Sequence, residues 1–274
     1  MTAPRANGVL DVSLLGIGLQ GPGFADWATG RAALHDPALW HSAPTVLVPP
    51  ARLPPAERRR AGAIVKLCIA VADQACAQAG ADTLQLATVF TASAGDGANC
   101  SALCEVLATP ERMVSPTRFT NSVHNAAAGY WHIATTSRAP STSLCAHDAS
   151  FGAGLLEAAS QCVAWQRPVL LVAGDTPYPE PLNGARPLPD AFACALLLAP
   201  AGQGGNALAQ LRLQLDAGTP TACEGASLEA LRQAIPAARG LSLLQALAQG
   251  AAQCTVEYQD GLALRVDLTP STPA

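Results

Sequence analysis

Residues 121–175 decide the fold of this chain, and they read NSVHNAAAGYWHIATTSRAPSTSLCAHDASFGAGLLEAASQCVAWQRPVLLVAGD. In this stretch, segments of small apolar residues at helical spacing alternate with short segments that are typical of strands. Each of these strand-like segments begins at or after a proline. The expected elements are, in order, a loop, a helix over 126–136, a strand over 140–146, a tight turn, a helix over 150–165 and a strand over 168–174. This order of elements indicates an α/β fold.

The flanking sequence continues the alternation of strands and helices. Before the central stretch we expect a strand over 10–19, a helix over 24–34, a long amphipathic helix over 55–79, a strand over 86–93 and a helix over 99–107. After it we expect strands over 191–198 and 207–216, a helical region over 227–249 that Pro236 would break, and a β-hairpin that turns at Asp260-Gly261. We therefore expect a layered domain over 1–200 and a C-terminal extension over 201–274 that packs on the same domain.

Composition excludes several classes of function. The net charge is -4, and the only basic cluster is Arg58-Arg59-Arg60, which argues against nucleic-acid binding. The sequence contains no apolar stretch long enough to span a membrane. Nine cysteines without a CxxC motif are typical of reduced thiols in the cytoplasm, and their spacing predicts neither a metal site nor a cofactor. Only 13% of residues are charged, which fits either a surface covered by a partner or alanine-rich helices.

Four blocks of the sequence resemble the β-ketoacyl synthase branch of the thiolase-like superfamily. They are VSLLGIGLQGPGFADWATGRAAL, RRAGAIVKLCIAVADQACAQAG, LATVFTASAGDG and the central stretch, with its pieces NAAAGYW, APSTS, AHDASFG and VLLVAGD. The motifs and the length of the sequence resemble those of a family of short synthase-like N-terminal domains. Members of this family are similar to chain length factors and come from aryl-polyene and pigment gene clusters. The resemblance implies half of a thiolase-like fold, with a mixed sheet packed by helices and a C-terminal helix and β-hairpin.

The resemblance also implies where a nucleophile would lie. Condensing enzymes of this class use a cysteine at the beginning of a buried helix together with two histidines from the second half of the chain. Alignment from either side places Asp148 or Ala149 at the nucleophile position, and neither carries a thiol. Cys145 comes three or four residues too early, and no histidine follows His147. We therefore expect no condensing activity from this chain alone, and a function as a non-condensing subunit similar to a chain length factor.

The resemblance suggests two sets of residues around this position. The expected contacts with a partner are Asn125, Ala126, Ala128, Gly129, Tyr130 and Trp131. The residues expected to shape a degenerate pocket are His124, Asp148, Ser150 and Phe151. Asp148 has a second interpretation, since an aspartate in this place also serves as a helix N-cap.

Two other functions remain open from the sequence. Cys145 and His147 would face the same side of a strand, so a thiol-dependent acyltransferase or hydrolase is one alternative. A scaffold that binds acyl carrier protein is the other. The expected partners are a full-length β-ketoacyl synthase, in a heterodimer, and acyl carrier protein, in a polyketide or fatty-acid-type pathway.

Overall fold

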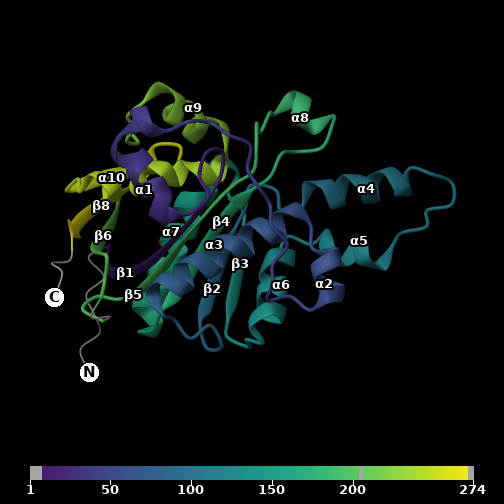
Figure 1. Cartoon of the computed structure of the whole chain (residues 1–274), viewed down its shortest axis with the longest axis horizontal. Coiled ribbons are helices and arrows are strands. Elements are labelled where there is room, and N and C mark those ends of the chain that lie inside the picture. Colours follow the sequence, from purple (N-terminus) through teal and green to yellow (C-terminus); the bar gives the residue numbers. More distant parts are fainter. Residues whose placement is uncertain (1–7, 204–205, 271–274) are drawn as a thin grey trace.

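The computed structural model describes residues 8–203 and 206–270, which build a mixed sheet with helices on both faces (Figure 1). The strands are β1 (Val9–Gln20), β2 (Ala87–Thr91), β3 (Ser141–Leu144), β4 (Val169–Asp175), β5 (Phe192–Pro200), β6 (Ala209–Asp216), β7 (Gln253–Gln259) and β8 (Leu262–Pro270). They form an eight-stranded sheet in the order β3-β2-β4-β5-β1-β6-β8-β7. The pairs β2–β3 and β2–β4 are parallel and the other pairs are antiparallel.

The helices form one layer on each face of the sheet and an arm beside it (Figure 1). The helices and 3-10 turns are α1 (Trp27–His35), η1 (Pro37–Leu39), α2 (Pro55–Arg60), α3 (Ala63–Ala79), α4 (Gly97–Leu107), α5 (Pro116–Asn121), α6 (Ala126–Thr135), η2 (His147–Ala149), α7 (Ser150–Trp165), α8 (Leu182–Ala185), α9 (Ala226–Ala234), η3 (Pro236–Gly240) and α10 (Leu241–Gln249). One core lies between the sheet and α3 with α6. The other lies between the sheet and a layer that contains α1, α7, α9, η3 and α10.

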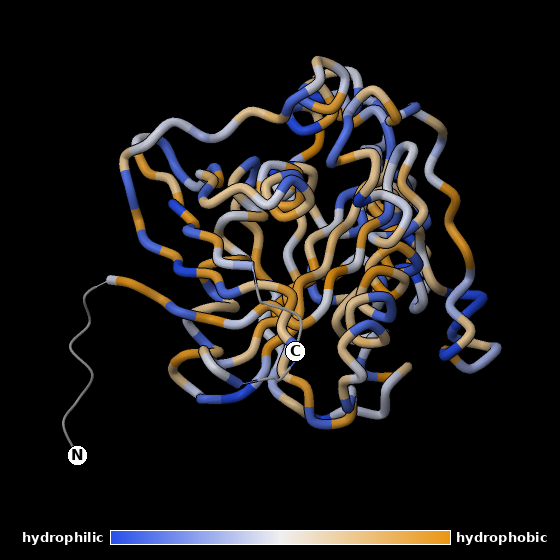
Figure 2. The backbone as a smooth tube through the Cα atoms, turned by 60° about the vertical axis from the view of Figure 1, so that its left-hand side comes forward, coloured by the Kyte–Doolittle hydropathy of each residue, from blue (hydrophilic) through white to orange (hydrophobic). Residues whose placement is uncertain are grey.

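The central strands explain why both faces are covered. Every residue of β4 and β5 is buried. Such continuous apolar runs are stable only when helices exclude water from both faces of the sheet. Figure 2 shows the hydrophobic stretches of the chain converging at the centre of the molecule. In β6 buried residues alternate with more exposed residues, as in a strand that has one solvent-exposed face.

Most predicted elements are confirmed, and two expectations are wrong. The predicted helix over 55–79 is divided into α2 and α3, with a break at Ala61 and Gly62. The chain passes close to another segment there, since a Cβ on Gly62 would lie 2.5 Å from the side chain of Asp96. The expected loop before α6 contains the short helix α5, which Ser115 caps and Pro116 begins. The break expected at Pro236 is confirmed, as is the hairpin at Asp260-Gly261.

The last three strands, β6, β8 and β7, extend the sheet beyond β1. The division of the chain near residue 200 stays a prediction. Within the described residues, no helix has the length and apolar character needed to cross a membrane.

Candidate functional site

A sharp turn connects strand β3 to helix α7, and we refer to residues 145–150 as the elbow. His147 lies at its apex with a φ of 54°, a conformation that costs energy for a residue with a side chain. The Ser150 hydroxyl donates to the carbonyl oxygen of His147 at 2.7 Å and accepts from the backbone N–H of Ala146 at 3.1 Å. Ser150 is buried, so it holds the elbow from within and does not line an open pocket.

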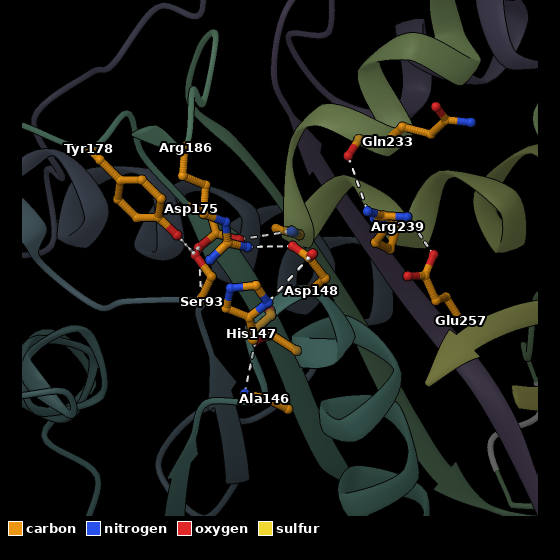
Figure 3. Close-up of polar contacts among 12 residues, drawn as sticks. Ser93, Ala146, His147, Asp148, Asp175, Tyr178, Arg186, Gln233, Arg239 and Glu257 are labelled. Carbon is orange, nitrogen blue, oxygen red and sulfur yellow. Dashed lines mark hydrogen bonds and ion pairs between the residues drawn. The ribbon is translucent and has the colours of Figure 1, made fainter. Parts of the chain in front are cut away.

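Asp148 does not cap the helix that follows it, and the N-cap interpretation is wrong. The N-cap position of α7 is Ala149, and no side chain bonds to the free amides there. The Asp148 carboxylate instead forms an ion pair with Arg186, from the loop after α8, and lies 3.5 Å from His147 Nδ1. The Arg186 guanidinium also lies over the ring of Tyr178, 5.6 Å from its centroid. Figure 3 shows these side chains converging beside the elbow.

A buried carboxylate beneath this cluster is the centre of a hydrogen-bond network. The sequence did not predict this network. Asp175, at the end of β4, is 2% exposed. One oxygen accepts from the Ser93 amide at 2.7 Å and from the Ser93 hydroxyl at 2.6 Å, and the other accepts from the Ala237 amide at 2.8 Å. Asp175 therefore connects β4 to the segment after β2 and to η3. Figure 3 shows Asp175 beside Ser93. The only sequence signal was an aspartate that ends an otherwise apolar strand.

Burial makes the charge of Asp175 costly. Desolvation raises its pKa to about 6, although the hydrogen bonds from Ser93 and Ala237 and the nearby Arg186 oppose the rise. In the unfolded chain an aspartate has a pKa near ~3.9. The unfolded chain therefore ionises at lower pH than the folded protein, so raising the pH through this interval destabilises the fold.

This difference predicts a pH dependence of stability that Asp175→Asn removes. As pH rises from about 4 to about 7, the Asp175 contribution to the unfolding free energy should fall by about 2–3 kcal/mol. The measurement is urea unfolding at several pH values for both proteins, with the slopes compared. The wild type should lose more stability over this range than the variant. Parallel curves would show that Asp175 ionises as freely inside the protein as in water.

Cys145 lies on the elbow but lacks the partner that nucleophilic catalysis needs. Its thiol donates to the carbonyl oxygen of Ser93 at 2.9 Å. Among the described residues, no histidine is hydrogen-bonded to Cys145, and the polar neighbour of His147 is Asp148. His124 belongs to a different place, beside Gly95. It lines a small cavity of about 10 Å³ beside the beginning of α6, space for about one water molecule.

The residues expected to contact a partner fall into two groups. Asn125 and Gly129 are exposed at the surface of α6. Ala126, Ala128, Tyr130 and Trp131 are buried within the chain. The last three of these pack into the core between α6, α3 and the sheet. Their side chains are covered within this chain, which argues against direct contact with a partner, and contact through the exposed Asn125 and Gly129 stays a prediction. The buried residues hold α6 in place, and the exposed side of this helix includes Gly129 and Ile133, next to the exposed N-cap residue Asn125.

Phe151 is likewise a core residue and does not line a pocket. Its side chain is fully buried and lies against Gly240 of η3. The open groove at the elbow is formed by Ala146 to Ala149 and the hairpin residues Glu257 to Asp260, and it measures about 450 Å³. Of the four residues expected to shape a pocket, Asp148 is the one that lines this groove.

Three solved structures illustrate the similarity of the fold. A chain in the complex of the ketosynthase ApeO with its chain length factor ApeC, from Xenorhabdus doucetiae, is 23% identical with a TM-score of 0.70, covering 94% of this chain and 99% of that one. A chain of the ishigamide ketosynthase/chain length factor is 15% identical with a TM-score of 0.69, covering 96% and 100%. A chain of AntDE:AntF, a type II ketosynthase with its acyl-carrier protein, is 12% identical with a TM-score of 0.70, covering 96% and 99%.

The sequence comparisons give a family but no individual relative. No protein with a curated description matches the chain. The sequence model of a family described as "Beta-ketoacyl synthase, N-terminal domain" matches residues 27–261, which include the elbow, the Asp175 network and the first part of the hairpin. The match spans most of the chain and agrees with the fold. This chain therefore belongs to the β-ketoacyl synthase N-terminal domain family.

Proposed function

We propose that this protein is a non-condensing subunit, similar to a chain length factor, that pairs with a catalytic ketosynthase in an aryl-polyene-like polyketide or fatty-acid-type pathway. The observation that carries the proposal is the chemistry of the elbow. The 3-10 turn η2, which leads into α7, presents the imidazole of His147 and the carboxylate of Asp148 and contains no cysteine, and the elbow's one thiol, Cys145, lies before this turn. Neither group forms the acyl thioester through which a condensing enzyme works.

The nearest thiol does not replace the missing nucleophile. A reactive cysteine needs a base or a positive charge that favours the thiolate. The hydrogen bond that the Cys145 thiol forms goes to the Ser93 carbonyl oxygen, which is neither a base nor a positive charge of that kind. Arg186, a cation beside the elbow, is engaged in its ion pair with Asp148. These contacts favour a supporting subunit over the thiol-dependent acyltransferase or hydrolase.

The open edge of the sheet supports pairing with another chain. β3 is the end strand next to β2, so one side of its backbone has no neighbour within the described residues. An edge strand of this kind is a template for pairing with another protein. The relatives named above include a ketosynthase in complex with its chain length factor, which suggests the same class of partner here. Acyl carrier protein is the second proposed partner, and we place the complex in the cytoplasm.

The proposal is tested by co-expression with a ketosynthase encoded by a neighbouring gene, followed by incubation with acyl carrier protein that bears a labelled acyl group. We expect the two chains to co-purify and the acyl group to appear on the ketosynthase alone, as measured by intact-protein mass spectrometry. Cys145→Ala should change neither result. An acyl adduct on this chain that disappears in Cys145→Ala would establish the thiol-dependent alternative instead.

A further inference from the structure

Residues 176–190 form a strap that connects the end of β4 to the beginning of β5. The strap contains the short helix α8 and otherwise no helix or strand, and Figure 1 shows α8 standing away from the sheet. Within the described residues, no backbone–backbone hydrogen bond joins residues 177–189 to the rest of the chain. The backbone bonds of this segment are internal, as between the Asn183 amide and the Pro179 carbonyl oxygen at 3.0 Å. A segment with so few backbone bonds to its surroundings opens at a low free energy.

Two side chains hold the middle of the strap against the body of the protein. The Tyr178 ring is buried, and its hydroxyl oxygen lies 2.5 Å from that of Ser93. The Arg186 guanidinium forms the ion pair with Asp148 at the elbow and lies over the Tyr178 ring. Figure 3 shows both side chains beside the elbow and Ser93. Because Arg186 and Tyr178 also contact each other, the loss of one attachment weakens the other.

The two ends of the strap are fixed separately. At the end of β4, the Asp175 carboxylate is held by the amide and the hydroxyl of Ser93. At the other end, Leu188 is buried, and the Asp190 carboxylate accepts from the Thr45 amide at 3.0 Å. These attachments do not involve the side chains of Tyr178 and Arg186. The strap can therefore swing about its ends while both of them stay in place.

We propose that the strap is a hinged lid that opens from the elbow, and that the ion pair between Asp148 and Arg186 is the latch that keeps it closed. Opening breaks this ion pair and the contact between Tyr178 and Ser93. The Asp148 and Arg186 side chains are 44% and 26% exposed, and ion pairs that are partly exposed in this way are weak and are screened by salt. The latch therefore releases the strap without unfolding of the protein. The inference concerns the free chain and does not depend on the proposed function.

The position of the strap decides which groups the elbow presents. In the closed position, Arg186 neutralises the Asp148 carboxylate. In the open position, the charged neighbour that Asp148 keeps is His147, whose Nδ1 lies 3.5 Å away. Withdrawal of the Tyr178 ring also uncovers the buried hydroxyl of Ser93. Opening therefore exposes an imidazole, a carboxylate and a hydroxyl that the closed strap keeps occupied or covered.

Two buried tyrosines of the same chain make this motion measurable. Tyr178 is 7% exposed beneath the strap, and Tyr130 is 6% exposed in α6, where its side chain packs into the core. Nitration by tetranitromethane, located by mass spectrometry, modifies a buried ring only after that ring becomes accessible. Tyr130 reports unfolding of the core. The ratio of the Tyr178 nitration rate to the Tyr130 nitration rate therefore isolates opening of the strap.

Two variants remove the latch to different extents. Arg186→Met removes the ion pair and the contact with the Tyr178 ring, so we expect the nitration ratio to rise about tenfold. Asp148→Asn removes the ion pair alone, and the ratio should rise about threefold. Burial raises the pKa of Tyr178, and Arg186 partly opposes this rise. Loss of the arginine charge by itself therefore makes the phenolate rarer, which slows nitration, so a faster reaction reports opening and not charge.

Arg212→Met is the matched control, since Arg212 forms an ion pair with Asp11 between β6 and β1, outside the strap and the elbow. Its nitration ratio should stay within about twofold of the wild type. Circular dichroism and urea unfolding confirm that each variant folds. Raising the salt concentration to about 1 M should increase the ratio of the wild type about threefold and should leave that of Asp148→Asn unchanged.

Two results would overturn the inference. If the ratio is the same in the wild type, in Arg186→Met and in Asp148→Asn, the ion pair does not hold the strap closed. If the nitration rates of Tyr178 and Tyr130 rise together, the strap opens only when the core unfolds. Either result leaves binding to the ketosynthase untouched, so the proposed function would stand.

Discussion

Gly18→Ala is expected to prevent stable folding, with a loss of more than about 4 kcal/mol in the free energy of unfolding. Gly18 lies in β1 where α3 crosses it, and a Cβ on Gly18 would lie 1.9 Å from the carbonyl oxygen of Val71 and 2.9 Å from its Cα. These are backbone atoms of α3, so no rotamer change relieves the clash and the helix must move away from the strand. The neighbouring Gly16 meets Ala75 in the same way, with a Cβ-to-oxygen distance of 2.1 Å.

Gly129→Ala is the matched control for this substitution. Gly129 lies inside α6, and a Cβ there would meet nothing within 4 Å. Replacing a helical glycine by alanine without a clash should raise the free energy of unfolding by about 0.5–1 kcal/mol. Urea unfolding followed by circular dichroism compares the two variants with the wild type. If Gly18→Ala unfolds at the same urea concentration as the wild type, the close contact between β1 and α3 does not exist in solution.

Phe151→Ala should lower the free energy of unfolding by about 3–5 kcal/mol. The ring is fully buried and fills the space against Gly240, where a Cβ would come within 2.6 Å of it. Its removal leaves a cavity between α7 and η3. Because η3 carries the Ala237 amide that binds Asp175, the same change should loosen the network beneath the elbow.

Phe119→Ala provides the comparison, since it removes the same atoms from a ring that is 63% exposed. A surface substitution of this kind should change the free energy of unfolding by no more than about 0.5 kcal/mol. Unfolding in urea measures the difference between the two variants. Equal effects at the two positions would contradict the assignment of Phe151 to the core.

Local patterns were sufficient for most of the fold. β1, α7 and the hairpin at Asp260-Gly261 were predicted within a few residues, because periodicity and turn chemistry depend on neighbours in the sequence. The family followed from short motifs, and the sequence model that matches residues 27–261 confirms it. The break between α2 and α3 was not predictable in this way, since it arises beside Asp96, far along the chain.

The site depended much more on contacts between distant segments. The sequence by itself determined most strands and helices, the family, and the absence of a thiol at positions 148 and 149. Only the tertiary structure decided that Asp148 pairs with Arg186 instead of capping α7, and that Asp175 meets Ser93 and Ala237. It also decided that Tyr130 and Trp131 face the interior. The physical reason is that hydrogen-bond partners and burial are set by how the layers pack, and no local pattern carries that information.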